Sequence, residues 1–245
     1  MKLQRHTGRR RAQRFLVEGP NLVGAAAAAG LVDEVFATAA AADRHAALLR
    51  GLPVQMITEA AAKALSETVT PAGLVAVCRA AEHDLDTVLA TAPRLIAVVV
   101  DLSEPGNAGT LIRTAHAMGA EAVVFAGSSV DPYNGKCLRS SAGSIFAVPV
   151  VIAPDVPATL ARLRDAGLQT LATTVDAGTT LDDADGLLTA RTAWVFGPEA
   201  HGLSEDVAAA ADHRIAIPMA EGAESLNVAA AAAICLYQSA RAHRR

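Results

Sequence analysis

The sequence contains few aromatic residues and few cysteines, and it has no long apolar segment. Phenylalanine, tryptophan and tyrosine make up 3% of the 245 residues, whereas hydrophobic residues make up 52%. The core must therefore be built from alanine and aliphatic side chains. No apolar run reaches the roughly 18 residues that a membrane span requires. The basic start is not followed by a signal-peptide apolar region. We therefore expect no membrane partner.

The three cysteines, Cys78, Cys137 and Cys235, are widely separated and form no C-x-x-C pair. An odd number of isolated cysteines is typical of a reduced, cytoplasmic protein in which thiols pack as small apolar side chains. Metal sites usually draw on closely spaced cysteine and histidine residues, so we predict no metal.

Basic residues are concentrated at the start of the chain. The formal net charge is −4, which is unexpected for a protein that binds RNA phosphates. However, residues 1–14 hold six lysine and arginine residues and no acid. Such a segment is either a solvated tail or an electrostatic arm for nucleic acid, and composition alone leaves both interpretations open.

Residues 15–80 alternate between strand-like and helix-like patterns, which predicts a small three-layer α/β unit. Asn21 is expected to cap the first helix. Residues 81–93 carry several charges and end at Pro93, which indicates a linker. The predicted strands are 14–19, 34–38, 54–57 and 74–78, and the predicted helices are 21–30, 41–50 and 59–65.

Residues 94–245 form a second α/β series. It begins with 95–101, an unbroken apolar run that is typical of a buried parallel strand. Further strands are predicted at 122–126, 169–174, 193–196 and 213–217, and helices at 108–118, 136–141, 156–166, 204–210 and 226–242.

Three short segments of this second series follow predicted strands and combine small residues with a few polar side chains. They are 107–113 (NAGTLIR), 196–204 (FGPEAHGLS) and 225–229 (SLNVA). Ligands of open parallel sheets bind beyond the carboxyl ends of the strands, so the placement suits a site.

Each segment also has an ordinary structural explanation. Asn107 and Ser225 can cap the helices that follow them, and Arg113 can be a solvated charge on a helix. Capping alone does not explain why all three strand ends carry a small-residue loop with a polar side chain.

Together, in this order and spacing, the three segments resemble the motifs of the SpoU (TrmH-like) branch of the SPOUT methyltransferases, which methylate ribose 2′-hydroxyls in RNA. The resemblance covers about residues 95–238, and the connecting stretch 131–146 is similar to the family too. Residues 15–80 resemble the L30e-like substrate-binding domain of such enzymes. The resemblance implies a parallel sheet whose C-terminal part threads a deep trefoil knot, bound S-adenosylmethionine, and a homodimer formed through the knotted region.

The resemblance also implies roles for individual residues. The active-site polar set would be Asn107, Arg113, Glu199, Ser225 and Asn227. The cofactor pocket would be lined by Gly197, Ile217, Met219 and Leu226. The candidate RNA contacts are Arg9, Arg10, Arg11, Arg139 and Ser141. Position 229 is alanine where the family often has serine, a departure outside the core set.

Arg113 is the family's proposed base, but a guanidinium is effectively always protonated. We therefore expect Arg113 to grip a neighbouring phosphate and to stabilise the developing alkoxide. Glu199 or a phosphate oxygen would then assist departure of the proton.

Two other classes of function compete with this interpretation. A dinucleotide-dependent oxidoreductase also has strand–glycine loop–helix units, but residues 105–109 lack the G-x-G-x-x-G spacing. A catalytically silent RNA-binding protein of the same fold is the second. Among RNA substrates we expect 23S ribosomal RNA, because the N-terminal unit resembles those of enzymes that modify ribosomal RNA. Transfer RNA is the alternative, and an antibiotic-resistance enzyme fits the same architecture.

Overall fold

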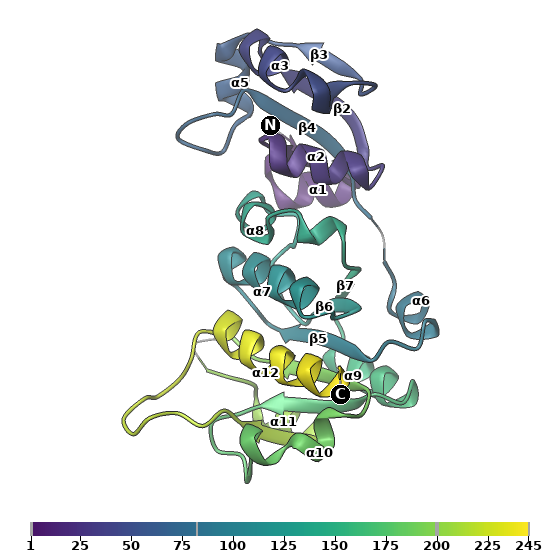
Figure 1. Cartoon of the computed structure of the whole chain (residues 1–245), viewed down its shortest axis with the longest axis vertical. Helices are drawn as coiled ribbons and strands as arrows, with labels where there is room; N and C mark the ends of the chain where they lie inside the picture. Colours follow the sequence, from purple (N-terminus) through teal and green to yellow (C-terminus); the bar gives the residue numbers. More distant parts are fainter. Residues whose placement is uncertain (1, 82, 199–200, 245) are drawn as a thin grey trace.

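The computed structural model describes residues 2–81, 83–198 and 201–244. It shows an elongated molecule with a smaller N-terminal unit at one end and a larger C-terminal unit at the other (Figure 1). Both units combine helices with a sheet, so the predicted α/β class is confirmed. Among the described residues, no helix is long and apolar enough to cross a membrane.

The N-terminal unit contains a four-stranded mixed sheet in the order β1-β4-β2-β3. Strand β4 pairs antiparallel with β1 and β2, and β2 pairs parallel with β3. In chain order the elements are η1 (Lys2–Gln4), α1 (His6–Ala12), β1 (Arg14–Glu18), α2 (Pro20–Ala28), β2 (Val32–Ala37), α3 (Ala39–Arg44), α4 (Ala46–Leu49), β3 (Val54–Met56), α5 (Glu59–Leu65) and β4 (Leu74–Arg79).

Residues 2–4 and 6–12 of the basic segment are helical, as η1 and α1. Two local predictions for this unit were wrong. The helix predicted at 41–50 is divided at His45 into α3 and α4. Asn21 does not cap α2. The helix instead begins one residue earlier at Pro20, whose fixed φ suits the first helical position, after Gly19 at φ 86°.

The C-terminal unit contains a seven-stranded sheet in the order β7-β6-β5-β10-β8-β11-β9. All its strand pairs are parallel. The elements are α6 (Leu85–Ala90), β5 (Leu95–Val100), α7 (Pro105–Ala117), β6 (Ala122–Ala126), α8 (Gly135–Ser141), η2 (Ser144–Phe146), β7 (Val150–Ala153), α9 (Val156–Asp165), β8 (Gln169–Thr173), β9 (Thr179–Thr180), η3 (Leu181–Asp183), α10 (Asp185–Leu188), β10 (Thr192–Phe196), α11 (Glu205–Ala210), β11 (His213–Ala216) and α12 (Val228–His243).

The sheet divides the core of this unit into two layers because side chains alternate along each strand. On β5, Ala97 and Val99 belong to the layer under α7, α8 and α12, which continues into the N-terminal unit. Ile96 and Val98 belong to the opposite layer, with α6 and α9. The single tryptophan, Trp194, is fully buried, and its indole donates a hydrogen bond to the Ser239 hydroxyl at 2.8 Å.

Helices α7 and α8 approach each other closely at Gly109. A Cβ atom at this position would lie 2.2 Å from the carbonyl oxygen of Cys137 and 2.6 Å from the Cβ atom of Ser140. Real Cβ atoms do not come so near to backbone. The glycine in the first polar segment is therefore needed for helix packing.

We predict that Gly109→Ala lowers the free energy of unfolding by about 1–3 kcal/mol, because the added methyl group overpacks the α7–α8 contact. Urea denaturation measures this change. Gly186→Ala is the matched control, since nothing lies within 4 Å of its added Cβ atom. Equal stability of Gly109→Ala and the wild type would contradict the close contact.

All three cysteines are buried. Burial raises the pKa of the thiols of Cys78 and Cys137 from 9.0 to about 12, with smaller contributions from Asp33 and Asp131 respectively. Burial also raises the pKa of Cys235. These thiols therefore stay protonated in the folded protein at pH values where the unfolded chain would ionise them.

This shift predicts a loss of stability at alkaline pH. A raised pKa means that the folded state holds the proton more tightly than the unfolded state does. The contribution of the thiols to the free energy of unfolding is therefore complete below pH 9 and is lost as the pH rises toward 12. Urea unfolding at pH 8 and pH 10 measures the loss. Cys137→Ala removes one such thiol and should show a smaller difference between the two pH values. An unchanged difference would rule out this contribution from Cys137.

Candidate active site

The three polar segments lie at one edge of the large sheet. They follow β5, β10 and β11, and these strands run parallel to one another within the sheet. Because the carboxyl ends of parallel strands meet at the same edge, the segments converge there. This arrangement places the start of α7, the loop after β10 and the start of α12 around one region.

Asn107, which the sequence offered as a possible cap of α7, does not cap this helix. Glu104 is the N-cap of α7 and accepts a hydrogen bond from the Gly106 N–H at 3.2 Å. It also pairs with Lys136 at 2.5 Å. The hydrogen bond from Lys136, followed by that from Gly106, lowers the pKa of the Glu104 carboxyl. Asn107 therefore lies in the first turn of α7, and its side chain makes another contact instead of capping the helix.

The side chains of Asn107 and Asn227 join the first and third segments. The Asn227 Nδ2 donates to the Asn107 Oδ1 at 3.1 Å. The Oδ1 of Asn227 accepts from the N–H groups of Ala229 and Ala230, so Asn227 is the N-cap of α12. Ser225, the other possible cap of this helix, does not have that role. The side-chain amide of Asn227 therefore caps α12 through its oxygen and forms a hydrogen bond with α7 through its nitrogen.

Arg113 lies further along α7, where its side chain is exposed. It makes no hydrogen bond or ion pair with the described residues. Its guanidinium is therefore available to an external anion, for which its planar fork is suited. Glu199, the expected acid of the second segment, lies outside the described residues.

A cavity of about 600 Å³ opens beside the second and third segments. Its size falls within the range of ligand sites in proteins. The four predicted cofactor residues, Gly197, Ile217, Met219 and Leu226, all line it, and so does Ser225.

Gly197 sits where the loop after β10 folds back on itself. A Cβ atom there would lie 2.4 Å from the Leu203 nitrogen. This tight backbone shapes one wall of the cavity. The cavity is also lined by Thr173, the last residue of β8, and by Thr174, Val175 and Asp176 after it. These residues were not among the predicted site residues, although their position at the end of a parallel strand was an available signal.

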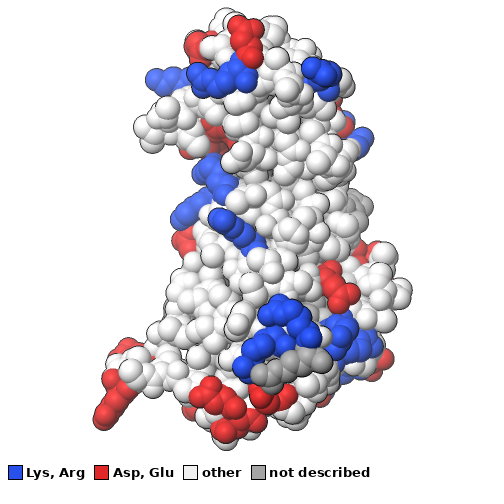
Figure 2. Space-filling view, in the orientation of Figure 1, with Lys and Arg blue, Asp and Glu red and all other residues white. Residues whose placement is uncertain are grey.

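Charged side chains surround the mouth of this cavity. Arg214 forms two hydrogen bonds with Glu205, at 3.2 and 2.5 Å, and these raise the pKa of Arg214. Figure 2 shows acidic side chains at the loop that projects between β11 and α12, which carries the exposed Glu221 and Glu224. In the same view, basic side chains lie along the left edge between the two units.

The candidate RNA contacts differ in exposure. Arg10 and Arg11 are exposed on α1, and Arg139 is exposed on α8, where it pairs with Glu67 at 3.7 Å. Arg9 and Ser141 depart from the expectation because both are buried. The Ser141 hydroxyl donates to the Leu138 carbonyl, and the Arg9 guanidinium pairs with Asp131. Neither side chain presents its polar group at the surface.

Comparison with known proteins agrees with this arrangement. Residues 94–237 match the model of the SpoU rRNA methylase family, and residues 1–76 match the MRM3-like substrate binding domain. The chain belongs to the SpoU rRNA methylase family. It is an RNA 2′-O-ribose methyltransferase that uses S-adenosylmethionine. The resemblance stated from the sequence is confirmed, and the oxidoreductase interpretation was wrong.

The similar proteins include enzymes that act on ribosomal RNA. The 23S rRNA (guanosine(2553)-2′-O)-methyltransferase RlmP of Bacillus subtilis is 34% identical, over 96% of this chain and 92% of that protein. The SpoU methyltransferase AviRb from Streptomyces viridochromogenes, solved with AdoMet, is 30% identical with a TM-score of 0.85, covering 98% of this chain and 94% of that one. An AdoMet-bound rRNA methyltransferase from Sinorhizobium meliloti is 26% identical, covering 98% and 91%, with a TM-score of 0.84.

Asn227 allows its two roles to be separated. Asn227→Asp keeps the oxygen that caps α12 but loses the amide donor to Asn107. We expect near wild-type thermal stability and a fall in kcat/KM of about fivefold, which corresponds to one hydrogen bond of about 1 kcal/mol. Asn227→Ala should lose activity and also about 1 kcal/mol of stability, because the cap is removed. Full activity of Asn227→Asp would show that the contact with Asn107 is dispensable.

Proposed function

We propose that this methyltransferase modifies a ribose in 23S ribosomal RNA, in the cytoplasm and as a homodimer. The observation that carries the proposal is the Asn107–Asn227 hydrogen bond, which joins two motifs beside the 600 Å³ cavity. The N-terminal substrate-binding unit shares a buried core with α8. It supplies a second surface for contact with a large RNA.

The matches over the whole chain favour ribosomal RNA over transfer RNA. RlmP, the curated relative matched over 96% of this chain, is named as a 23S rRNA methyltransferase. A solved structure titled for methylation of C/U34 on tRNA covers only 60% of this chain, with a TM-score of 0.53. The match to RlmP includes the N-terminal unit, so we associate this unit with the larger substrate.

The cavity residues would hold S-adenosylmethionine. When bound, this cofactor supplies a methyl group on a positively charged sulfonium. Gly197 keeps the loop close enough for backbone groups to face the ligand, and Ile217, Met219 and Leu226 give the cavity apolar walls. Acidic residues at the mouth, Asp176 and Glu224, complement the positive charge of the ligand.

Arg113 would bind the phosphate next to the target ribose and stabilise the negative charge that develops on the 2′-oxygen. Asn107, held by Asn227, would orient the ribose, and Glu199 or a phosphate oxygen would take the proton. Holding the 2′-oxygen in line with the methyl group supplies much of the acceleration, since the reaction needs accurate alignment of its partners.

The outer face of α12 supports a homodimer formed through the C-terminal region. This is the region where the family resemblance implies a knot. Ile234 and Tyr237 are 37% and 50% exposed and stand three residues apart on this helix. Residues at that spacing share one helix face. Exposed apolar side chains in a group are typical of surfaces that bind another protein, here a second copy of the chain.

Labelled methyl transfer to total bacterial RNA tests the substrate. We expect label in 23S ribosomal RNA, and a single gap in an alkaline cleavage ladder, because a methylated 2′-oxygen cannot attack its neighbouring phosphate. Label in transfer RNA alone would overturn the assignment of the substrate, and label on bases would overturn the assignment to ribose.

Arg113→Lys tests the phosphate-clamp role. Lysine keeps the charge but cannot form the bidentate fork, so kcat/KM should fall by about ten- to a hundredfold at pH 7. Arg164→Lys is the control, because Arg164 is an exposed helical arginine on α9, in the opposite layer. Activity of Arg113→Lys equal to that of the control would contradict a bidentate contact.

A further inference from the structure

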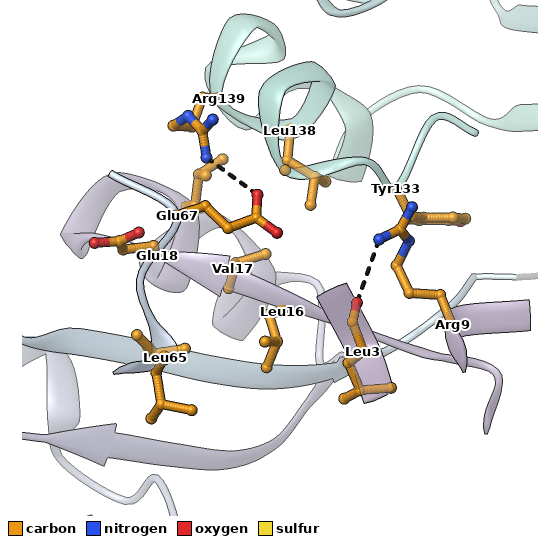
Figure 3. Close-up of a pocket in the computed structure, with 13 residues that line it drawn as sticks. Leu3, Arg9, Leu16, Val17, Glu18, Leu65, Glu67, Tyr133, Leu138 and Arg139 are labelled. Atoms are coloured by element: carbon orange, nitrogen blue, oxygen red, sulfur yellow. Dashed lines mark hydrogen bonds and ion pairs between the residues drawn. The ribbon is translucent and has the colours of Figure 1, made fainter. Parts of the chain in front are cut away.

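The junction between the two units is a packed interface, and the basic arm forms part of it. Figure 3 shows side chains of the arm, β1 and the end of α5 facing Tyr133, Leu138 and Arg139 of the C-terminal unit. They enclose a small cavity of about 30 Å³. Leu138 belongs to the same buried core as Phe15 and Val17 of β1. The substrate-binding unit therefore shares its core with the catalytic unit.

A buried ion pair lies at one side of this interface. The Nε and Nη2 of Arg9 donate to Oδ2 of Asp131 at 2.8 and 2.7 Å, and the two side chains are 8% and 10% exposed. The Nη1 of Arg9 donates to the carbonyl oxygens of Leu3 and Gln4. The Asp131 Oδ1 accepts from the Tyr133 N–H at 2.9 Å. The charges thus have several hydrogen-bond partners, which burial requires.

The loop that contains Asp131 also makes two other contacts with the N-terminal unit, both through Tyr133. The ring of Tyr133 stacks on Phe15, with 4.5 Å between ring centroids. The Tyr133 hydroxyl donates to the carbonyl oxygen of Ala81, at the end of the N-terminal unit. The arm, the first strand and the exit of the N-terminal unit are therefore all joined to residues 131–133.

The same loop leads directly to the active-site helix. Asn134 caps α8, and α8 packs against α7 at Gly109, two residues after Asn107. The Val130 N–H donates to the Leu102 carbonyl at 2.7 Å, which ties the loop to the segment that enters α7. A rigid series of contacts thus runs from Arg9 to the helix that carries Asn107 and Arg113.

We infer that the Arg9–Asp131 ion pair is a positioning element that fixes the substrate-binding unit relative to the methyl-transfer site, and so selects which nucleotide is methylated. The inference rests on the proposed function, in which the N-terminal unit holds the RNA. A ribose can react only when its 2′-oxygen reaches the methyl group, so a shift of the RNA-holding unit changes the nucleotide presented. Arg10 and Arg11, exposed on the same short helix, would contact the RNA in the proposed function, whereas Arg9 is buried and attaches that helix to Asp131.

The test replaces the ion pair without leaving a lone buried charge. The double variant Arg9→Met with Asp131→Leu exchanges the pair for apolar side chains, a change that buried ion pairs often tolerate. Asp33→Asn is the matched control, since Asp33 pairs with Arg14 at 2.7 Å within the N-terminal unit. Each full-length variant is assayed for methyl transfer to 23S ribosomal RNA, for S-adenosylmethionine binding by calorimetry, and for the methylated position by alkaline ladder.

We expect the double variant to bind S-adenosylmethionine as the wild type does. Its kcat/KM for RNA should fall by about tenfold or more, and the ladder should show methylation at neighbouring positions. A merely structural role would not move the position of the methyl group. Unchanged kcat/KM together with one unchanged gap would overturn the inference.

Two results keep this test separate from the proposed function. If the wild type does not methylate 23S ribosomal RNA, the proposed substrate fails and the ladder is repeated on the RNA that is labelled. If the double variant does not fold, Arg9→Lys replaces it, because lysine keeps the charge but cannot reach Asp131 and both carbonyl groups in one geometry. Wild-type selectivity of folded Arg9→Lys would then overturn the inference.

Discussion

The close contact of α7 with α8 at Gly109 is the constraint on which the rest of the structure depends. With no side chain at position 109, the backbone of α8 can lie against α7, and any Cβ atom would collide with the Cys137 carbonyl. Helix α7 carries Asn107 and Arg113 to the edge of the sheet, and α8 contacts the N-terminal unit through Leu138. One glycine therefore connects the placement of the candidate catalytic side chains with that of the substrate-binding unit.

The charged side chains of the two units differ in burial and pairing. Arg9 and Asp131 are buried and bonded to several partners, so their desolvation is compensated locally. Arg113 is exposed and makes no ion pair with the described residues. An arginine at the surface without a neutralising acid keeps its attraction for phosphate, which pairing would reduce. A chain with a net charge of −4 can thus bind RNA through a few well-placed cations.

The sequence predicted the main features of the sheet and failed at details that depend on pairing. The apolar run 95–101 correctly indicated the buried central strand β5. The strand at Val150–Ala153 was missed although its residues are apolar, and the two-residue strand β9 has no sequence signal. The order of strands depends on contacts between distant segments, which no local pattern encodes. The family resemblance supplied what periodicity could not.

At the candidate site too, some features could be predicted from the local sequence, and others depend on contacts between residues far apart in the chain. Asn107 and Ser225 were considered as possible helix caps, whereas Glu104 and Asn227 have that role. Pro105 was an available signal, since proline favours the first helical position and places the cap just before it. No comparable signal distinguished Arg9 from Arg10 and Arg11. Successive residues of a helix point about 100° apart, so three adjacent arginines must face different surroundings, and only the position of Asp131 decides which one is buried.

The geometry also bears on how the ribose proton is removed. A base must offer a lone pair, and a guanidinium has none while it is charged. The Arg113 side chain is exposed on α7 and makes no ion pair with the described residues. An exposed cation on α7 is well placed to attract the phosphate that flanks the target ribose and to stabilise negative charge on the 2′-oxygen. The proton then has to leave toward an oxygen acceptor, and a phosphate oxygen held by Arg113 would be brought close to the hydroxyl by the same contact that orients the RNA.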